Sequence, residues 1–361
     1  MKLLVLTALV GLAAAKPTPT WNHEIVVVGR ADDPASKPAV TDQASIGFAT
    51  LNGGTTGGLG GAVTTASTLA EFTAAVGEKN TAPGIVFVKG VIEGSAKVRI
   101  GSNKTIVGLP GSRLKGIGLH FRRQKNLILR NIVSSFVPAA NGDALTIDGS
   151  TNVWVDHCEF FSVKGSEKDK DVYDGLVDLT HGSDFVTISH TSFHDHWKGS
   201  LVGHSDSNAD QDRGKLRVTY ANNHWRNIGS RGPSLRFGTG HIFNSFFEGP
   251  MYSAVNTRMG AQVLVESNVF RNVEQPVTSI DSKQQGYAVV VDTDLGGAPN
   301  RAPGGSFSAA AVPYKYTLLG SSRVAAAVPQ DVGAILTFEP MAAGNETTTP
   351  HAKRAQTTRI W

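Results

Sequence analysis

The stretch "VWVDHCEF", residues 153–160, alternates apolar residues with others, then places a polar residue fifth and an aromatic residue eighth. The alternation predicts a β-strand that ends at a turn. Five further segments follow this pattern approximately: "LILRNIVS" (127–134), "VTISHTSF" (186–193), "VTYANNHW" (218–225), "GHIFNSFF" (240–247) and "VLVESNVF" (263–270). Their spacing, about 22 to about 33 residues, lies in the range typical of solenoid repeats. The segment therefore predicts one coil of a repeating structure.

The repeat favours an all-β, right-handed parallel β-helix, because consensus leucines of a leucine-rich horseshoe do not recur. In such a solenoid each strand stacks on its equivalent in the next coil. A polar residue at an inward bend pairs with its equivalents above and below, and amide and imidazole groups both donate and accept. We predict that ladder at the fifth positions, and interpret His157 and His190 as structural. The fifth positions are Asn131, His157, His190, Asn222, Asn244 and Ser267.

Composition supports one large folded unit. The 361 residues are 40% hydrophobic and 18% charged, and we predict a single β-helix domain at 16–338. The only cysteine, Cys158, excludes an internal disulfide and is expected to be buried. In "TASTLAEFTAAVGEK" (65–79), Ser67 or Thr68 can cap a short helix that covers the N-terminal end of the solenoid. The glycine-rich stretch 47–61 is expected to be an irregular loop near that cap.

The termini predict a secreted protein. Residues 1–15 carry a lysine, an apolar run and a small-residue end, which are typical of a signal peptide. No later segment has the length of a transmembrane helix, so we expect no membrane association. Residues 339–361 are polar and are expected to be disordered. The sequons at Asn103 and Asn345 are candidate glycosylation sites.

Charge is segregated along the chain. The net charge is +4, and acids crowd residues 141–212. No Asp or Glu occurs between Asp212 and Glu248, an interval that holds "SRGPSLRFGTGH" (230–241), with Arg231 and Arg236 around Pro233. Adjacent acidic and basic stretches predict a bipolar site, and the basic part would attract a polyanion.

Three carboxylates form a candidate metal site. Asp174 and Asp178 are four apart, about 13 Å on a straight strand, which is too far to share an ion. Gly175 can bend the chain and bring them together, and Asp143 would join them from the preceding coil. Calcium takes 6–8 oxygen ligands, so such a set leaves room for water and substrate. Taken alone, the residues also fit an interpretation as solvated loop acids.

The segments "NVWVDHCEF" (152–160), "YDGLVDLTHGSDFVTISHTSFHDHWKGSLVGHSDSNAD" (173–210) and "VTYANNHWRNIGSRGPSLRFGTGHIFN" (218–244) resemble the pectate lyase family, the secreted fungal branch above all. The resemblance covers about residues 47–338. It implies a β-helix whose long loops form a substrate groove, and calcium-dependent β-elimination of de-esterified polygalacturonate in plant cell-wall pectin. It implies no nucleic-acid partner, and we expect a monomer.

By position, the resemblance makes Asp143, Asp174 and Asp178 the calcium ligands. It makes Arg231 the catalytic base, and Lys198 and Arg236 the residues that bind substrate carboxylates. This sequence departs from some relatives at Asn141 and Asp174, where they carry aspartate and glutamate. An arginine base must lose a proton whose ordinary pKa is about 12.5–13.8, and repulsion from nearby cations acts in that direction.

Three other functions remain as alternatives. A calcium-independent pectin lyase, acting on methyl-esterified polymer, would be expected to lack the acidic cluster. A polygalacturonase needs paired carboxylic acids at separations suited to glycoside hydrolysis, which residues 213–236 do not offer. A non-catalytic polysaccharide-binding β-helix would not need the set of Lys198, Arg231 and Arg236.

Overall fold

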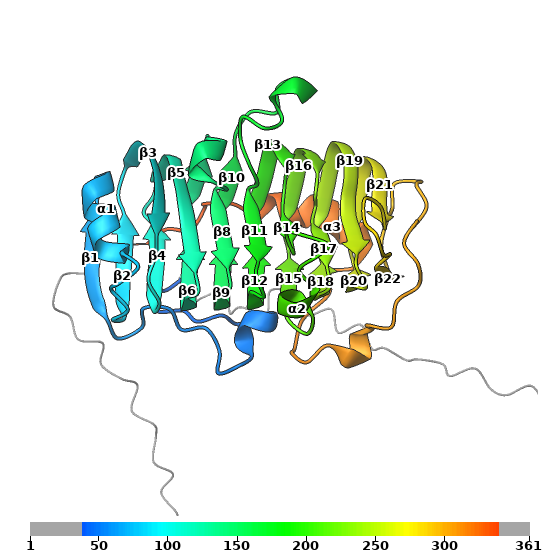
Figure 1. Cartoon of the computed structure of the whole chain (residues 1–361), viewed down its shortest axis with the longest axis horizontal. Helices are drawn as coiled ribbons and strands as arrows, with labels where there is room; N and C mark the ends of the chain where they lie inside the picture. Colours follow the sequence, from blue (N-terminus) through cyan, green and yellow to red (C-terminus); the bar gives the residue numbers. More distant parts are fainter. Residues whose placement is uncertain (1–37, 339–361) are drawn as a thin grey trace, which may run out of the picture.

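The computed structural model describes residues 38–338, and over them the chain is a parallel β-helix (Figure 1). The predicted signal peptide (1–15), the predicted disordered tail (339–361) and Asn345 lie outside the described residues. One sheet of ten parallel strands runs the length of the solenoid. Its strands, in spatial order, are β1 (Ala62–Ala66), β2 (Gly84–Val88), β4 (Lys104–Gly108), β6 (Lys125–Arg130), β9 (Thr151–Asp156), β12 (Asp184–Ser189), β15 (Arg217–Ala221), β18 (Thr239–Phe243), β20 (Gln262–Glu266) and β22 (Tyr287–Val291).

The second sheet has twelve strands and covers the two other sides of the solenoid, because β5 and β19 each pair with strands on both sides. One side, called the front face below, contains β3 (Val91–Arg99), β5 (Arg113–Arg122), β8 (Leu145–Asp148), β11 (Val177–Thr180), β14 (Leu201–Val202), β17 (Ser234–Arg236), β19 (Phe246–Arg258) and β21 (Val269–Thr278). The other side contains β7 (Val133–Ser135), β10 (Glu159–Phe161), β13 (Ser192–Lys198) and β16 (His224–Ser230). All these pairings are parallel, as the repeat predicts.

The interior holds one large apolar cluster, and equivalent side chains of successive coils stack within it. The aromatic residues at the eighth repeat position form one such stack, with ring centroids 3.9–5.8 Å apart and every ring fully buried. They are Phe160, Phe193, Trp225, Phe247 and Phe270. The aromatic residue at the eighth position of the repeat therefore lies in the core.

The buried polar ladder lies one residue later than we predicted. The fifth-position residues adopt a left-handed backbone, with φ of 46–58°, and turn the chain at the corner. The corner directs the sixth-position side chain inward. There, Thr191 N donates to Asn223 Oδ1 at 2.9 Å, and Ser245 N donates to Asn268 Oδ1 at 2.8 Å. These four residues are fully buried, so the sixth position carries the ladder.

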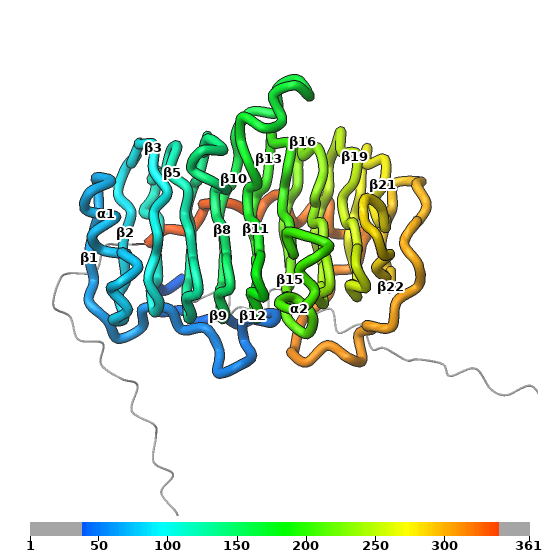
Figure 2. The backbone as a smooth tube through the Cα atoms, in the orientation of Figure 1, coloured from blue at the N-terminus to red at the C-terminus, as the bar shows by residue number. Residues whose placement is uncertain are grey.

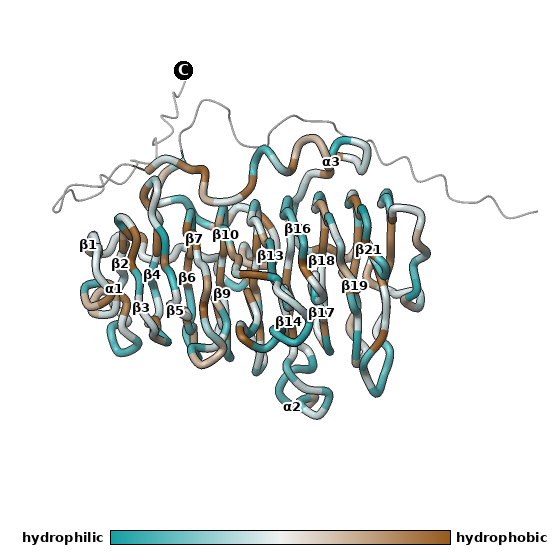
Figure 3. The backbone as a smooth tube through the Cα atoms, turned by 90° about the horizontal axis from the view of Figure 1, so that it is seen from above, coloured by the Kyte–Doolittle hydropathy of each residue, from teal (hydrophilic) through white to brown (hydrophobic). Residues whose placement is uncertain are grey.

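Four of the six fifth-position side chains, those of Asn131, His190, Asn244 and Ser267, instead contact the C-terminal segment. This segment runs back along the solenoid (Figures 2 and 3). Asn131 exchanges two hydrogen bonds with Leu336, and Asn244 Oδ1 accepts from Leu319 N at 2.9 Å. At the far end of the segment, Phe338 packs in a small apolar cluster with residues of β2 and β4. The polar fifth positions thus hold this segment on the outside.

The predicted N-terminal helix is present as α1 (Leu69–Val76). Thr68 caps it in a reciprocal pair of hydrogen bonds with Glu71, and Phe72 and Val76 are buried against the first coils. The glycine-rich stretch 47–61 is irregular, as predicted, but it starts at the middle of the solenoid: Phe48 N donates to Thr219 Oγ1 and Ala49 N to Thr187 Oγ1. The other helical segments are η1 (Phe48–Thr50), η2 (Ala139–Asn141), η3 (Glu167–Asp169), α2 (Ala209–Asp212), η4 (Ala309–Ala311), α3 (Ser321–Ala327) and η5 (Val328–Gln330).

Two smaller predictions concern the surface. Within residues 38–338, no helix combines the length and the apolar character that crossing a bilayer requires. Asn103 lies at a corner with φ of 58°; its Nδ2 donates to Thr81 O at 3.0 Å, and its Oδ1 accepts from Asn126 at 2.9 Å. Glycosylation of Asn103 stays a prediction.

Candidate active site

Two of the three predicted acids converge on the front face. Asp143 lies just before β8, and Asp178 lies in β11 on the next coil. A Cβ added to Gly175 would lie 2.5 Å from Asp178 Oδ1 and 2.9 Å from Asp143 Oδ1. Both carboxylates therefore approach one point beside Gly175, and only glycine leaves room there. The N–H of Gly175 donates to Asp143 Oδ1 at 2.9 Å, and the predicted bend that would bring Asp174 to Asp178 stays a prediction.

The two carboxylates are buried, Asp143 being 9% and Asp178 6% exposed. Burial raises the pKa of Asp178 well above its usual range; repulsion from Asp143 adds to the rise and Arg231 opposes it. Burial also raises the pKa of Asp143, against the hydrogen bond that Thr146 Oγ1 donates at 2.6 Å. Two buried like charges of this kind favour binding a cation between them.

Asp174 occupies a different position from the other two acids. Its Oδ1 lies 3.3 Å from Lys198 Nζ, which also contacts Asp171 Oδ1 at 2.9 Å. Over the described part of the chain, the ligand atoms of Asp143, Asp174 and Asp178 do not all lie within 4.8 Å of one another. The charge of Asp174 nevertheless acts on both other acids, raising the pKa of each. The structure thus brings together Asp143 and Asp178, with Asp174 beside them and turned toward Lys198.

The two predicted arginines lie on the coil after Lys198. Arg231 follows β16 with φ of 62°, and its carbonyl accepts from Ser200 N at 2.7 Å. Arg236 ends β17, and its side chain is 9% exposed. Its Nε donates to Asp206 Oδ1 at 2.6 Å and its Nη1 to Gly203 O at 2.8 Å. Arg231 therefore lies near the acids, whereas Arg236 is held by protein partners.

Two arginines of the basic stretch 213–236 form ion pairs outside the candidate site. Arg217 pairs with Asp184, and Arg226 lies 3.5 Å from Asp195 Oδ2 on the opposite side of the solenoid. These acids come from the preceding coil, so they neutralise part of the positive charge that looked unpaired in the sequence. Only the last two arginines of the stretch, Arg231 and Arg236, belong to the candidate site.

Sequence reasoning missed several residues that organise the site. His196 Nε2 donates to Asp174 O at 2.6 Å, and burial lowers the pKa of His196 to about 4, so the ring is neutral near pH 7. Asp206, within the acidic stretch before the arginines, orients Arg236. Arg258 occupies the register position next to Arg236, and burial followed by repulsion from Arg236 lowers its pKa to about 10. Arg258 lies outside the basic stretch 213–236, and only the strand register shows that it is a neighbour of Arg236.

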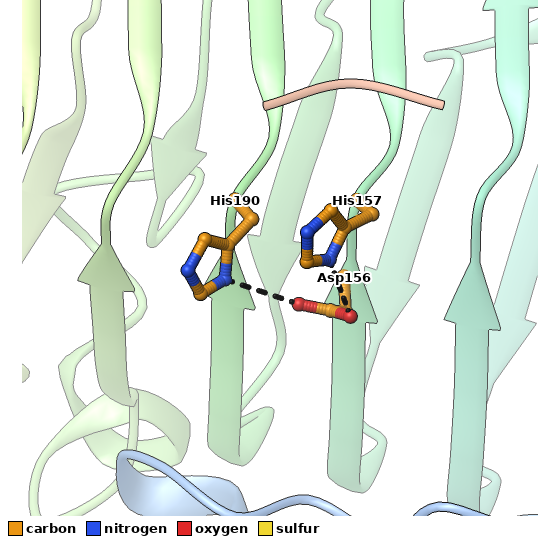
Figure 4. Close-up of side chains that lie close together, drawn as sticks. All are labelled: Asp156, His157 and His190. Carbon is orange, nitrogen blue, oxygen red and sulfur yellow. Dashed lines mark hydrogen bonds and ion pairs between the residues drawn. The ribbon is translucent and has the colours of Figure 1, made fainter. Parts of the chain in front are cut away.

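The cluster of Asp156, His157 and His190 lies at a corner of the ten-stranded sheet, at the end of β9 and β12 (Figure 4). The two imidazole rings stack with centroids 4.6 Å apart, and Asp156 Oδ2 lies 2.8 Å from His157 Nδ1. Arg130 Nε donates to the same oxygen at 2.9 Å, and Ser189 Oγ donates to Asp156 Oδ1 at 2.7 Å. With these partners the carboxylate is part of a structural network, which supports the structural interpretation of both histidines.

A family model described as pectate lyase matches residues 33–334. The chain belongs to the pectate lyase family. This pectate lyase is 52% identical over 325 residues to pectate lyase B of Colletotrichum gloeosporioides, covering 89% of this chain and 96% of that one. It is 48% identical over 332 residues to pectate lyase A of Aspergillus niger, covering 91% and 96%. It is a polysaccharide lyase.

Solved structures support the same fold. A pectate lyase from Bacillus sp. N165, in complex with trigalacturonate, is 30% identical with a TM-score of 0.73, covering 80% of this chain and 98% of that one. A Bacillus subtilis pectate lyase, at 23% identity and a TM-score of 0.72, covers 84% and 99% and shows the fold alone. The predicted parallel β-helix and the resemblance to pectate lyases are both confirmed.

Proposed function

We propose that this pectate lyase is secreted and cleaves de-esterified α-1,4-polygalacturonate by calcium-dependent β-elimination, degrading plant cell-wall pectin. One observation carries the proposal: two buried carboxylates converge beside Gly175, on the coil before Lys198 and two coils before Arg231. An acidic pair next to basic groups suits a substrate that has one carboxylate on every sugar.

The donor set fits calcium. Carboxylate oxygens are the ligands that this hard cation prefers, and Asp143 and Asp178 supply them without any nitrogen or sulfur donor. The space beside Gly175, which a Cβ would fill, lies against both Oδ1 atoms. We assign Asp143, Asp174 and Asp178 as the ligands. When bound, the ion would neutralise a substrate carboxylate and so acidify the neighbouring C5–H bond.

The chain's own residues supply the rest of the reaction. In the proposed step, Arg231 takes the proton from C5, the released electron pair forms the C4–C5 double bond, and the C4–O4 bond breaks. The leaving sugar keeps O4 and is protonated by solvent, and the other product carries a 4,5-unsaturated sugar. Lys198 and Arg236 bind substrate carboxylates and stabilise the negative charge that develops.

The test is to incubate the protein with polygalacturonate, with and without calcium, and to follow the ultraviolet absorbance of the unsaturated product. We expect activity to vanish in a strong chelator and to return with calcium. Asp178→Ala should mimic the chelator, whereas Asp210→Ala, an exposed acid of α2, should not. Full activity in chelator would favour the pectin lyase alternative. New reducing ends without absorbance would indicate a hydrolase, and binding without cleavage a non-catalytic β-helix.

A further inference from the structure

A row of side chains crosses the front face from the acids toward the N-terminal coils. In strand register, Asp178 of β11 lies beside Thr146 of β8, then His120 of β5, then Arg99 of β3. Their neighbours Val177, Leu145, Leu119 and Val98 all point into the core. Because side chains alternate along a strand, the row lies on the outer surface. It leads from Asp178 to Arg99 in three strand steps, about 14 Å.

The basic groups at the end of this row have few partners. Lys97 extends over Gly142, where a Cβ would lie 3.1 Å from its Nζ. Between residues 38 and 338, no carboxylate lies within 4.0 Å of Lys97 Nζ. Arg99 is 53% exposed and has only a 3.6 Å contact with Glu78. This differs from Arg217 and Arg236, each of which is paired at close range with an acid of another coil.

His120 lies between these cations and the acids. Its side chain is 12% exposed, and neither ring nitrogen has a hydrogen-bond partner in the part of the chain that the structure describes. Asp148 is 3.6 Å from Nε2. Next to it, Arg122, Arg123, Asp148, Gly149, His181 and Gln211 line a polar recess on the same face. The outer side of the sheet from β11 to β3 is therefore polar, and it ends in a basic group, Arg99, that is exposed to solvent.

We propose that Lys97, Arg99 and His120 form a distal subsite for a carboxylate of the polyuronate, about three sugar units from the cleaved bond. The inference rests on the proposed function. A polyuronate carries one carboxylate on each sugar, and the strand spacing of about 4.8 Å is close to the length of one sugar unit. A chain lying along the solenoid axis would thus extend over several strands, and those of its carboxylates that face the protein could reach basic groups some strands away from the acids. The acids, Lys198 and Arg231 act at the cleaved bond, and Lys97 and Arg99 hold the polymer further along.

The double variant Lys97→Ala/Arg99→Ala tests this inference in the full-length protein. Lys125→Ala/Arg226→Ala is a matched control, because it removes the same two charges from other sides of the solenoid. Turnover is followed with calcium present on two substrates: long polygalacturonate and trigalacturonate. We expect the double variant to raise KM for the long polymer roughly tenfold, as two partly exposed charge contacts would, and to leave trigalacturonate within twofold of wild type.

The same assay separates the possible failures. If Lys97→Ala/Arg99→Ala behaves as the control does on both substrates, these side chains are solvated surface charges and the inference is wrong. An equal loss on both substrates also overturns it, because the residues would then act at the cleaved bond. If wild type forms no unsaturated product from either substrate, the proposed function itself is wrong.

Discussion

Replacing Gly175 with alanine should damage the proposed calcium site without changing any charge. The added Cβ would lie 2.5 Å from Asp178 Oδ1 and 2.9 Å from Asp143 Oδ1, whereas ordinary contact begins at 3.4 Å. The nearer carboxylate must move by about 0.9 Å, several times the roughly 0.2 Å by which ligand distances vary in metal sites. Neither carboxylate turns freely, because Asp178 Oδ1 accepts from Leu201 N and Asp143 accepts from Gly175 N and Thr146.

We therefore expect Gly175→Ala to raise the calcium concentration for half-maximal activity by about 10- to 100-fold, the usual effect of disturbing groups that support metal ligands. Calcium titration of polygalacturonate cleavage measures this, and calorimetry of calcium binding measures it without turnover. Gly304→Ala is the control, because nothing lies within 4 Å of its Cβ position. An unchanged calcium requirement in a folded Gly175→Ala protein would refute the assignment of Asp143 and Asp178 as ligands.

Three further predictions concern the arginines, the ladder and the buried aspartate. Arg231→Lys should lower kcat by about 10²–10⁴ with little change in KM, and the wild-type rate should rise at alkaline pH, because a base acts only when neutral. Arg236→Lys should mainly raise KM, since it loses the bonds to Asp206 and Gly203; equal effects on KM in both variants would make Arg231 a carboxylate ligand only. Asn223→Ala should cost roughly 2–4 kcal/mol in urea unfolding, because it leaves Thr191 N–H unpaired, at about 1–3 kcal/mol, and removes the hydrogen bond to Ile188 O, at about 1 kcal/mol. The adjacent Asn222→Ala should cost only about 1 kcal/mol, because alanine is less stable than asparagine in a left-handed backbone. If Asn222→Ala destabilised the protein more than Asn223→Ala, the buried ladder would lie at the fifth position after all. Burial alone would raise the pKa of Asp156, but His157 and His190 hold it well below its usual range, so this network stabilises the fold above about pH 4 and is lost as pH falls. Asp156→Asn should therefore flatten the fall of melting temperature between about pH 4 and pH 2, and an unchanged acid dependence would contradict the assigned network.

The fold was predictable because its signal is local and repeated. Each coil carries the same alternation, so the parallel stacking, the aromatic core position and the helix cap at Thr68 all follow from short stretches of sequence.

The errors have a different physical origin. The left-handed backbone of His157 and its equivalents turns the chain at each corner, and this turn decides which of two adjacent polar residues points inward. Sequence alternation does not reveal it. Pairs such as Arg217 with Asp184 join residues 33 apart, so they depend on the exact register between coils. The same holds for Arg236 with Asp206 and for the position of Arg258.

Register between coils also decides the chemistry, because each coil supplies only one or two of the groups. Asp178 and Arg231 come from different coils, and the short segment that begins β14 lies between them. Ser200 N donates to Arg231 O at 2.7 Å, and the next amide, Leu201 N, donates to Asp178 Oδ1 at 2.9 Å. Two adjacent backbone N–H groups thus fix the backbone of the proposed base and the carboxylate of a proposed calcium ligand relative to each other. Backbone donors move little when side chains change. The backbone of the solenoid therefore sets the relative position of the acid and the base. Substitutions can change the side chains that lie between this site and β3 without moving the two groups.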